Sequence, residues 1–482
     1  MPKRILFTPS YFYRLDEKQW QNQQPYPPYG TLLAAAYIRK AGFDVQLFDS
    51  NLKYSPSEIQ EQLQSFKPDY VVVFDDSFNY LSKMCLTVMS DACLELIRYS
   101  KAAGCKVLLN SSDATDHSKK YLEKGADIVI KGEGELTLHE LLTTDCAALE
   151  TCLGISYLHN GNETINAKRS VLTNLDLLPA PAWDLVDINA YKKIWLNAHQ
   201  KFSLNIATTR GCPFKCNWCA KPIYGNRYNS RSPQAVVDEL KLLMQQFGAT
   251  HFWVCDDIFG LKPGWVEEFS KLLKMANLKP TFKIQCRADL LLKENTIQHL
   301  VAAGLDEVWI GAESGSQQVL DAMEKGTQVT QIYDATKLLK KYGVKVCFFL
   351  QYGYLGESKK DIDKTLSMVK ELMPYDIGVS VSYPLPGTGF YEKVKVQLST
   401  KQNWTDSDDL AMMYQAQYSQ KFYKHLHRHT HTFFRKQKSI ATLKNMFTQL
   451  GNMDVQQLKL IVKLPYHWLA EKVSSQKLKS LQ

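Results

Sequence analysis

The hydrophobic pattern of the N-terminal third of the chain is that of a buried parallel sheet. Residues 1 to about 140 contain short runs that are apolar at every position, such as Tyr70 to Phe74 and Val107 to Leu109, separated by segments with helical periodicity. Strands that are apolar at every position are typical of a sheet covered on both faces. The pattern therefore predicts a Rossmann-like, doubly wound α/β domain whose last strand is Ile128 to Ile130.

A second series of strands and helices runs from about residue 201 to 395. Its six predicted strands are Leu204 to Thr208, His251 to Cys255, Thr281 to Cys286, Glu307 to Gly311, Lys345 to Leu350 and Gly378 to Tyr383. The intervening helices include 233–246 and 330–342, and Thr330 is suited to cap the second. Six such units joined by right-handed crossovers predict an open, partial (β/α)6 barrel.

The remaining regions are a connection and a tail. Residues 141–200 contain Pro179 and Pro181, whose spacing favours an extended tether. Residues 396–482 are predicted to form a basic helical C-terminal region. The expected architecture is thus an α/β protein with a doubly wound domain (1–140), a connecting region (141–200), a partial barrel (201–395) and a helical region (396–482).

Length and composition narrow the class of protein. A chain of 482 residues is too long for a single core. It contains no apolar run of about 18 residues, which predicts that no helix spans a membrane. The N-terminus lacks the apolar segment of a signal peptide, and the eleven cysteines do not resemble a secreted disulfide framework. We therefore expect a cytoplasmic protein.

The positive charge is concentrated near the C-terminus. The formal net charge is +9, and residues 401–482 contain 13 Lys and Arg residues against 5 Asp and Glu residues. Such a region could face an anionic substrate, a membrane surface or nucleic acid, or it could be a solvated helical surface. The tract His425 to His431 places histidines four residues apart, but no acidic or cysteine ligand lies near. A substrate-facing basic lid is the preferred interpretation, ahead of a metal site.

The strongest chemical signal is the loop after the first barrel strand. Cys212, Cys216 and Cys219 have the spacing C-x3-C-x2-C. Three thiolates at this spacing can bind three irons of a cubane cluster and leave the fourth iron open to a reactive ligand. A structural zinc site would need a fourth ligand, which does not follow at zinc-finger spacing, and an incidental group of core cysteines is the other alternative.

This loop resembles the signature of the radical S-adenosylmethionine (SAM) enzymes. The resemblance implies a 4Fe–4S cluster held by the three cysteines, with SAM on the open iron. Reductive cleavage of SAM then yields a 5′-deoxyadenosyl radical, and the electron comes from a reductase such as a flavodoxin or a ferredoxin.

Four residues after the barrel strands are candidates for binding SAM, because the site of a β/α barrel lies at this end. Asp257 stands where the family contacts the methionyl amino group, usually through a Gly-Gly-Glu motif that is absent here. Arg287 could hold a carboxylate or form a structural ion pair with Asp289. Glu313 and Ser314 stand where relatives bind the ribose or carboxylate of the cofactor. No catalytic residue is assigned from the sequence.

The N-terminal domain resembles the cobalamin-binding domain that precedes many radical SAM barrels. The resemblance lies in the Pro27 to Gly30 turn and the Gly-Glu-Gly-Glu loop at 132–135. The residues proposed to bind cobalamin follow the predicted strands: Ser77, Ser111, Asp113, Gly132, Glu133 and Gly134. The D-x-H-x-x-G motif, whose histidine coordinates cobalt, is absent, so a vestigial domain that only packs on the barrel remains an alternative.

Several further segments resemble the branch that contains the anaerobic magnesium-protoporphyrin monomethyl ester cyclase. They are residues 348–357, 383–388 and 403–410. This resemblance implies a large apolar or porphyrin-like substrate that is modified at an unactivated carbon, as in an oxidative cyclase. A cobalamin-dependent C-methyltransferase is the alternative. A tRNA methylthiotransferase would need further cluster cysteines and an RNA-binding tail, so nucleic acid is not the expected partner. A non-catalytic corrinoid or cluster carrier is the last alternative.

Overall fold

The N-terminal part of the protein is a seven-stranded sheet with helices on both faces. The computed structural model describes residues 2–78, 86–398, 412–448 and 455–481. The strands are β1 (Arg4–Thr8), β2 (Asp44–Leu47), β3 (Tyr70–Phe74), β4 (Lys106–Asn110), β5 (Ile128–Ile130), β6 (Ile155–His159) and β7 (Asn162–Ile165). Their order is β2-β1-β3-β4-β5-β6-β7, and the first five strands of this order are parallel. The predicted doubly wound domain is confirmed.

The helices of this domain divide between the two faces of the sheet. They are α1 (Glu17–Asn22), α2 (Tyr29–Lys40), α3 (Ile59–Phe66), α5 (Thr87–Ala102), α6 (Ser112–Asp116), α7 (Ser118–Leu122) and α8 (Glu135–Thr143). Alternate residues of the strands point to opposite faces. Phe7 and Val72 pack in one hydrophobic cluster with α2 and α8, whereas Leu6 and Val71 pack in another with α3 and α5.

The prediction that Ile128–Ile130 is the last strand of the sheet is wrong. β6 pairs antiparallel with β5, and β7 pairs antiparallel with β6. The two strands are joined by Asn160 and Gly161, which both have positive φ, as a tight hairpin turn requires. This Asn-Gly pair was the sequence signal for the hairpin. Residues 178–182 are extended as expected and lie between two short 3-10 turns, before α9 (Ile188–His199).

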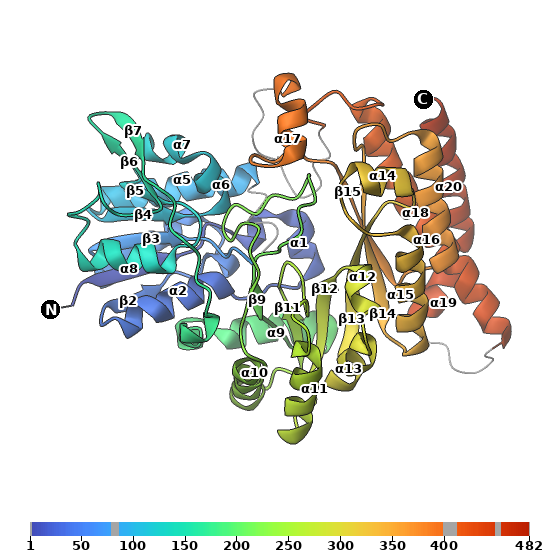
Figure 1. The fold of residues 1–482 in the computed structure, drawn as a ribbon, viewed down its shortest axis with the longest axis horizontal. Coiled ribbons are helices and arrows are strands. Elements are labelled where there is room, and N and C mark those ends of the chain that lie inside the picture. The colour runs from blue at the N-terminus through green and yellow to red at the C-terminus, as the bar shows by residue number, and fades with distance from the viewer. Residues whose placement is uncertain (1, 79–85, 399–411, 449–454, 482) are drawn as a thin grey trace.

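The second sheet is the predicted partial barrel. Its strands are β8 (Ser203–Ile206), β11 (His251–Val254), β12 (Thr281–Cys286), β13 (Leu305–Glu313), β14 (Lys345–Tyr352) and β15 (Asp376–Val381). All pairs are parallel, and the order β15-β14-β13-β12-β11-β8 leaves β8 and β15 at opposite edges. A barrel whose first and last strands do not pair is open along one side. In Figure 1 the N-terminal domain lies on the side of β8.

The strands of the barrel alternate with helices. These are α10 (Pro233–Phe247), α11 (Trp265–Met275), α12 (Ala288–Leu291), α13 (Thr296–Ala303), α14 (Gln317–Ala322), α15 (Val329–Lys341) and α16 (Lys359–Leu372). The expected cap of α15 at Thr330 is wrong. Gln328 is the N-cap, because its side chain and that of Gln331 exchange hydrogen bonds with each other's backbone.

The C-terminal region is helical, as predicted. It contains α17 (Gly389–Val394), α18 (Gln420–Thr448), α19 (Val455–Val462) and α20 (Leu464–Lys479). Phe422 and Leu426 of α18 pack on Tyr352 and Val381, so α18 covers the outer side of β14 and β15. In Figure 1, α18 lies between α16 and α20, and α20 forms the outer layer. The segment 403–410 lies outside the described residues.

The histidine tract is part of this helical layer, and its interpretation as a substrate-facing lid is wrong. His429 is buried, and its Nδ1 lies 3.0 Å from the Ser474 hydroxyl of α20. The side chain of the next residue, Thr430, donates a hydrogen bond to the Tyr352 hydroxyl. Part of the tract therefore packs against α20 and β14.

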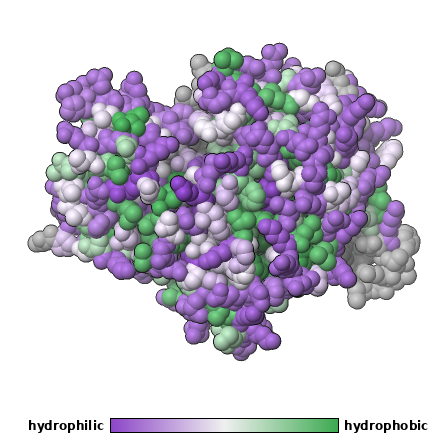
Figure 2. Space-filling view, viewed as in Figure 1, coloured by the Kyte–Doolittle hydropathy of each residue, from purple (hydrophilic) through white to green (hydrophobic). Residues whose placement is uncertain are grey.

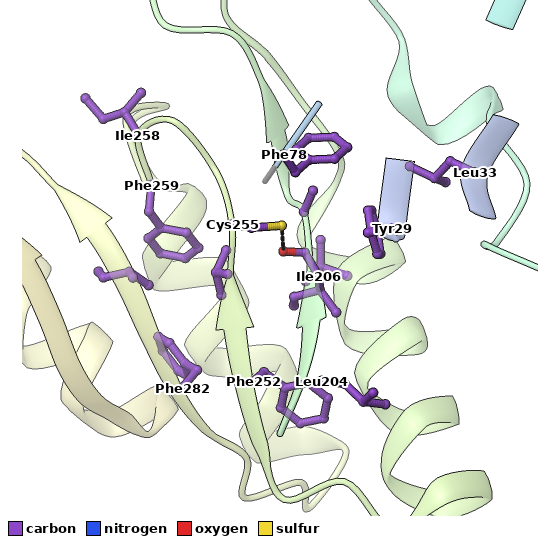
Figure 3. Packing of buried hydrophobic residues seen from close by; sticks show 14 of the residues in the cluster. Tyr29, Leu33, Phe78, Leu204, Ile206, Phe252, Cys255, Ile258, Phe259 and Phe282 are labelled. Atoms are coloured by element: carbon purple, nitrogen blue, oxygen red, sulfur yellow. Dashed lines mark hydrogen bonds between the residues drawn. The ribbon is translucent and has the colours of Figure 1, made fainter. Parts of the chain in front are cut away.

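One hydrophobic core continues from the N-terminal domain into the barrel. Figure 3 shows Tyr29 and Leu33 of α2 beside Ile206 of β8 and Cys255, which follows β11. Across the same boundary the Tyr29 hydroxyl donates to the Glu239 carboxylate of α10. The face seen in Figure 2 is mostly hydrophilic, with hydrophobic residues in small groups. No helix in the described part of the chain is long and apolar enough to cross a membrane.

A substitution of Gly134 tests how closely the start of α8 packs against the sheet. A Cβ at this position would lie 2.7 Å from the ring of Phe74 and 3.0 Å from Asn110. Because both neighbours are enclosed in the core, we expect Gly134→Ala to lower the free energy of unfolding by about 1–3 kcal/mol, measured by urea denaturation. Gly389→Ala is the matched control, since its Cβ would be in ordinary contact at 3.4 Å. Equal stabilities for the two variants would contradict this account.

Candidate functional site

The three motif cysteines lie in a loop that begins at the carboxyl end of β8. The loop is closed at its base by a short antiparallel pair, β9 (Thr209–Arg210) and β10 (Asn229–Ser230). Gly211 has φ +79°, and a Cβ there would lie 2.5 Å from the Arg227 carbonyl, so only glycine fits before Cys212. None of the three cysteines is in a disulfide.

Asn217, inside the motif, fixes this loop to the far strands of the barrel. Its backbone N–H donates to the Met323 carbonyl at 3.1 Å, and its side-chain amide donates to the Ala322 carbonyl at 2.9 Å. Its side-chain oxygen accepts from the Tyr354 hydroxyl at 2.7 Å, and its carbonyl accepts from the Phe390 N–H at 2.7 Å. Segments after β13, β14 and β15 therefore all hold one residue of the loop.

The three thiols share one electrostatic environment. Burial raises the pKa of Cys219 to about 12, the nearby Lys221 opposes this shift, and Asp257, Cys216 and Cys212 add to it. Burial also raises the pKa of Cys212, with smaller contributions from the same carboxylate and from Cys216. The raised pKa values favour the neutral thiol at Cys212 and at Cys219, and a bound metal would deprotonate both.

The donor set fits a cluster better than a single ion. Within the described ranges, no three His, Cys, Asp or Glu side chains are grouped closely enough to hold one metal ion. In a cubane each cysteine binds a different iron, so its three thiolates need not converge on one point. The loop, with three thiols outside any disulfide, thus has the composition that an iron–sulfur cluster with one open iron requires.

The two aspartates after β11 have different surroundings. Asp256 is fully buried, and one carboxylate oxygen accepts from the backbone N–H groups of Thr208 and Thr209 at 2.7 and 3.0 Å. It therefore ties the end of β11 to the end of β8. Asp257 is exposed and close enough to Cys212 and Cys219 to affect their pKa values. Asp257 is thus placed to meet a ligand beside the thiols.

Arg287 forms the structural ion pair that was the alternative to a carboxylate clamp. Its Nε and Nη2 donate to Asp289 at 2.9 and 3.2 Å, and its Nη1 donates to the Lys325 carbonyl at 2.7 Å. Its guanidinium stacks 3.8 Å from the ring centroid of Phe214 in the cysteine loop. In this structure Arg287 supports the loop, and its predicted contact with SAM stays a prediction.

Glu313 and Ser314 lie at a distorted end of β13. The register with β14 shifts between Gly311 and Glu313, and Glu313 has φ +58°, a conformation that is strained for a residue with a side chain. The Glu313 carboxylate is buried 2.8 Å from the Lys325 ammonium. The Ser314 hydroxyl lies 3.1 Å from that of Thr365. Strain of this kind is common at ligand sites, but neither side chain is free in this structure.

Two of the residues predicted to bind cobalamin contact the cysteine-loop region, and their role in binding a cofactor stays a prediction. The guanidinium of Arg210, two residues before Cys212, is buried between the carboxylates of Glu133 and Glu135, each at 2.5 Å. Burial opposes the charge on Arg210, but Glu135 and Glu133 raise its pKa well above the usual value. Ser77 likewise lies 2.5 Å from the Tyr224 hydroxyl of the same region.

Of the other four predicted residues, Ser111, Gly134 and Asp113 make contacts inside the N-terminal domain, whereas Gly132 approaches the cysteine-loop region. Ser111 caps α6 by accepting from Ala114, and Gly134 packs against Phe74. Gly132 has φ +76° and approaches the Ile223 carbonyl. Asp113 accepts from Tyr121 and contacts His117; although burial acts in the opposite direction, these hydrogen bonds lower the pKa of Asp113 to about 2. Their role in binding a cofactor stays a prediction.

The structure shows a cavity of about 250 Å³ where the N-terminal domain meets the barrel. It is lined by Tyr11, Tyr13, Gln19, Gln24, Tyr26, Asn51, Asp76, Asn205, Trp253 and Lys283. Tyr11 and Asp76 follow β1 and β3, between which the strand order reverses, and ligands of doubly wound sheets bind at such a point. Asn205 and Lys283 come from barrel strands β8 and β12.

This cavity offers unused polar atoms. The Tyr11 hydroxyl and the Asn205 side-chain oxygen are buried without a hydrogen-bond partner. Buried polar atoms normally have a partner, so these two are suited to a polar ligand or to water. Sequence reasoning missed the cavity because its N-terminal part follows β1, β2 and β3, whereas most of the predicted residues follow β4 and β5. The Tyr11-Phe12-Tyr13 run after the first strand was the available signal.

The sequence of the barrel matches a known family. Residues 206–369 match the radical SAM superfamily. This segment is a radical SAM domain. It contains all three motif cysteines together with Asp257, Arg287, Glu313 and Ser314.

Similarity to known proteins extends beyond the radical SAM domain. The chain is 26% identical over 390 residues to an uncharacterised methyltransferase of Pyrococcus horikoshii, covering 78% of this chain and 81% of that protein. It is 24% identical over 381 residues to the anaerobic magnesium-protoporphyrin IX monomethyl ester cyclase of Rubrivivax gelatinosus, covering 77% of this chain and 66% of the cyclase. The cobalamin-dependent SAM radical enzyme OxsB, with aqua-cobalamin and SAM bound, superposes with a TM-score of 0.74 at 17% identity, covering 98% of this chain and 72% of OxsB. This superposition shows that the radical SAM domain and the domain before it share the fold of OxsB.

Arg210 tests whether the radical SAM domain depends on its contact with the N-terminal domain. Arg210→Met removes the charge and leaves two buried carboxylates unpaired, so we expect the free energy of unfolding to fall by about 3–5 kcal/mol in urea denaturation. Arg39→Met is the control, because the Arg39–Asp184 pair is exposed and should contribute less than about 1 kcal/mol. A loss for Arg210→Met no greater than that of the control would refute the proposed dependence.

Proposed function

We propose that this protein is a cobalamin-dependent radical SAM enzyme that modifies an unactivated carbon of a large apolar substrate. The observation that carries the proposal is the loop of three free thiols at the carboxyl end of an open parallel barrel, with the exposed Asp257 beside it. The radical SAM match over residues 206–369 and the similarity to the Rubrivivax cyclase and to OxsB support it.

Cys212, Cys216 and Cys219 would hold the 4Fe–4S cluster, and Asp257 would receive the amino group of SAM. When bound, the cluster supplies the electron that cleaves SAM reductively, and a flavodoxin or ferredoxin supplies that electron in turn. The chain itself orients the loop: Gly211 permits its first turn, Asn217 anchors its middle, and Arg287 stacks on its Phe214. Glu313 and Ser314 would contact the rest of SAM from the end of β13.

Cobalamin would lie at the junction of the two domains. The cavity there is below the usual volume of about 300–1,000 Å³ for small-molecule pockets, so the junction has to widen to admit a corrin ring. Its polar lining and the unpartnered Tyr11 and Asn205 atoms fit the polar edge of such a ligand. The residues at the adjoining strand ends would also contact cobalamin: Glu133, Gly134, Gly132, Ser111, Asp113 and Ser77. The absence of the D-x-H-x-x-G motif implies binding without a histidine ligand.

The interior of the barrel supports an apolar substrate. Trp309 and Phe349 stack with ring centroids 4.7 Å apart on neighbouring strands, and a Cβ on Gly378 would meet both rings. The Trp309 indole N–H donates to Glu307, whose register partner on β12 is the cavity residue Lys283. The aromatic pair therefore faces the inside of the barrel, and Phe349 is 36% exposed there. A partly exposed aromatic surface inside a barrel is suited to a planar or lipid-like substrate.

Two outcomes are compatible with this site. The first is an oxidative, cyclase-like reaction, supported by the similarity to the Rubrivivax cyclase. The second is transfer of a methyl group, supported by the similarity to the Pyrococcus methyltransferase.

When a substrate is known, the mass of the product distinguishes the two reactions. With SAM that carries a trideuterated methyl group, a methyltransferase adds the labelled methyl to the product. The oxidative reaction adds no label and changes only the hydrogen and oxygen content. We expect one of these two mass changes in liquid chromatography–mass spectrometry, and the transfer of a methylthio group would contradict both.

Removing the cluster ligands tests the proposal directly. Because each thiolate would bind its own iron, Cys212→Ala, Cys216→Ala and Cys219→Ala should each lower the bound iron and sulfide and abolish release of 5′-deoxyadenosine from reduced, reconstituted protein. Cys146→Ala is the control, since this free, partly buried thiol lies in the N-terminal domain. Cleavage of SAM that persists in all three motif variants would overturn the proposal.

A further inference from the structure

The outermost helix layer carries an apolar stripe that no other described element covers. Leu458, Val462, Tyr466, Leu469 and Val473 are 48% to 78% exposed. Their spacing of four, four, three and four residues places them on one face of a helix. Such a contiguous apolar stripe differs from the single exposed apolar residues that are normal on protein surfaces.

The stripe is continuous across the junction of α19 and α20. The Lys463 N–H donates to the Lys459 carbonyl, and the His467 N–H donates to the Lys463 carbonyl, at 3.1 and 2.9 Å. Both are bonds between residues four apart, so the helical phase passes through the junction despite Pro465. The five residues therefore form one surface.

The opposite face of α20 is used for packing on α18. His467 and Leu478 are buried, the Ser474 hydroxyl contacts His429, and Glu471 pairs with Lys436 at 2.9 Å. These contacts fix the rotation of α20, so the stripe points away from the protein. In Figure 1, α19 and α20 lie on the side of the protein away from the N-terminal domain.

Positive charge flanks the stripe on both sides. The lysines are Lys459 of α19, Lys463 between the two helices, and Lys472, Lys477 and Lys479 of α20. The single acidic residue of these two helices, Glu471, is neutralised by Lys436 on the packed face. Trp468 is 53% exposed beside the stripe, with the Lys472 ammonium 5.2 Å from its ring centroid. Apolar residues with Trp, Tyr and a lysine rim are the composition of helices that lie in a membrane interface.

We infer that α19 and α20 dock the protein on an anionic lipid surface. The stripe enters the boundary between headgroups and acyl chains, Trp468 and Tyr466 lie at headgroup level, and the lysines meet anionic phosphates. Charge complementarity selects this occupant, because a neutral protein partner would leave the lysine rim unmatched. The inference does not depend on the proposed reaction, since vesicle binding is measured without cofactors or turnover.

Co-sedimentation of the full-length protein with lipid vesicles tests this inference. We expect binding to vesicles of phosphatidylcholine with phosphatidylglycerol, and much weaker binding to phosphatidylcholine alone. In about 0.5 M salt, where the screening length falls to about 4 Å, binding should weaken at least severalfold. No binding to the anionic vesicles would overturn the inference.

Two variants separate the apolar and the charged contributions. The double variant Leu469→Ser, Val473→Ser should weaken vesicle binding about tenfold or more. The triple variant Lys463→Gln, Lys472→Gln, Lys477→Gln should remove the preference for anionic lipid. The matched control is Met275→Ser with Leu177→Ser, which alters two apolar residues elsewhere that are more exposed than Leu469 and Val473, and it should bind like the wild type. All of these side chains are exposed, so the variants should keep the wild-type circular dichroism spectrum.

Self-association is the competing use of the stripe. Sedimentation velocity without lipid should show the same oligomeric state for the wild type and the Leu469→Ser, Val473→Ser variant. A wild-type dimer that this double variant dissociates would overturn the inference, as would wild-type vesicle binding by the variant.

Discussion

The arrangement of the two domains depends on the burial of one positive charge. Arg210 has left water completely, and it is stable there only because Glu133 and Glu135 of the N-terminal domain both pair with it. It lies on the short strand β9 that leads into the cysteine loop. The entry to the loop is therefore anchored outside the barrel, and any change in the position of the N-terminal domain acts directly on the cysteines.

The open barrel makes this dependence possible. In a closed barrel the first strand would pair with the last, but here β8 is an edge strand. Its missing neighbour is replaced by contacts with the N-terminal domain: the Asn205 amide donates to the Pro27 carbonyl, and Tyr26 contacts Ser203. The junction cavity lies beside these contacts. On one side of it are the ends of β1 and β3, where the strand order of the N-terminal sheet reverses, and on the other is the interior of the barrel. A ligand there would touch both domains.

The sequence predicted the fold well wherever hydrophobic periodicity carried the information. The five parallel strands of the first sheet and all six of the barrel were recognisable, because each is a short apolar run between helices. The hairpin β6–β7 was missed because the end of β6 is exposed and β7 has no fully buried residue, so neither strand is an apolar run. It also lies in the region that Pro179 and Pro181 marked as a connection. The cysteine motif was recognisable because its chemistry depends on local spacing.

The partners of single side chains were much less predictable. Glu133 and Ser77 were interpreted as cofactor ligands from their positions after strands. Their contacts with Arg210 and Tyr224 lie 77 and 147 positions away in the sequence. Nothing local distinguishes a strand-end glutamate that faces a cofactor from one that faces a buried arginine. Arg287 is the intermediate case: Asp289, two residues on, indicated an ion pair, and the ion pair is present.

Asn217 has a consequence for the order of assembly. Its partners Ala322, Met323, Tyr354 and Phe390 are all synthesised after it, the last of them 173 residues later. The cysteine loop therefore stays without its main anchors while the chain is being made, and it reaches its final shape only when the last barrel strand is in place. Iron–sulfur transfer from a donor would accordingly follow translation, and an interrupted chain that ends before residue 390 would expose reactive thiols that it cannot position.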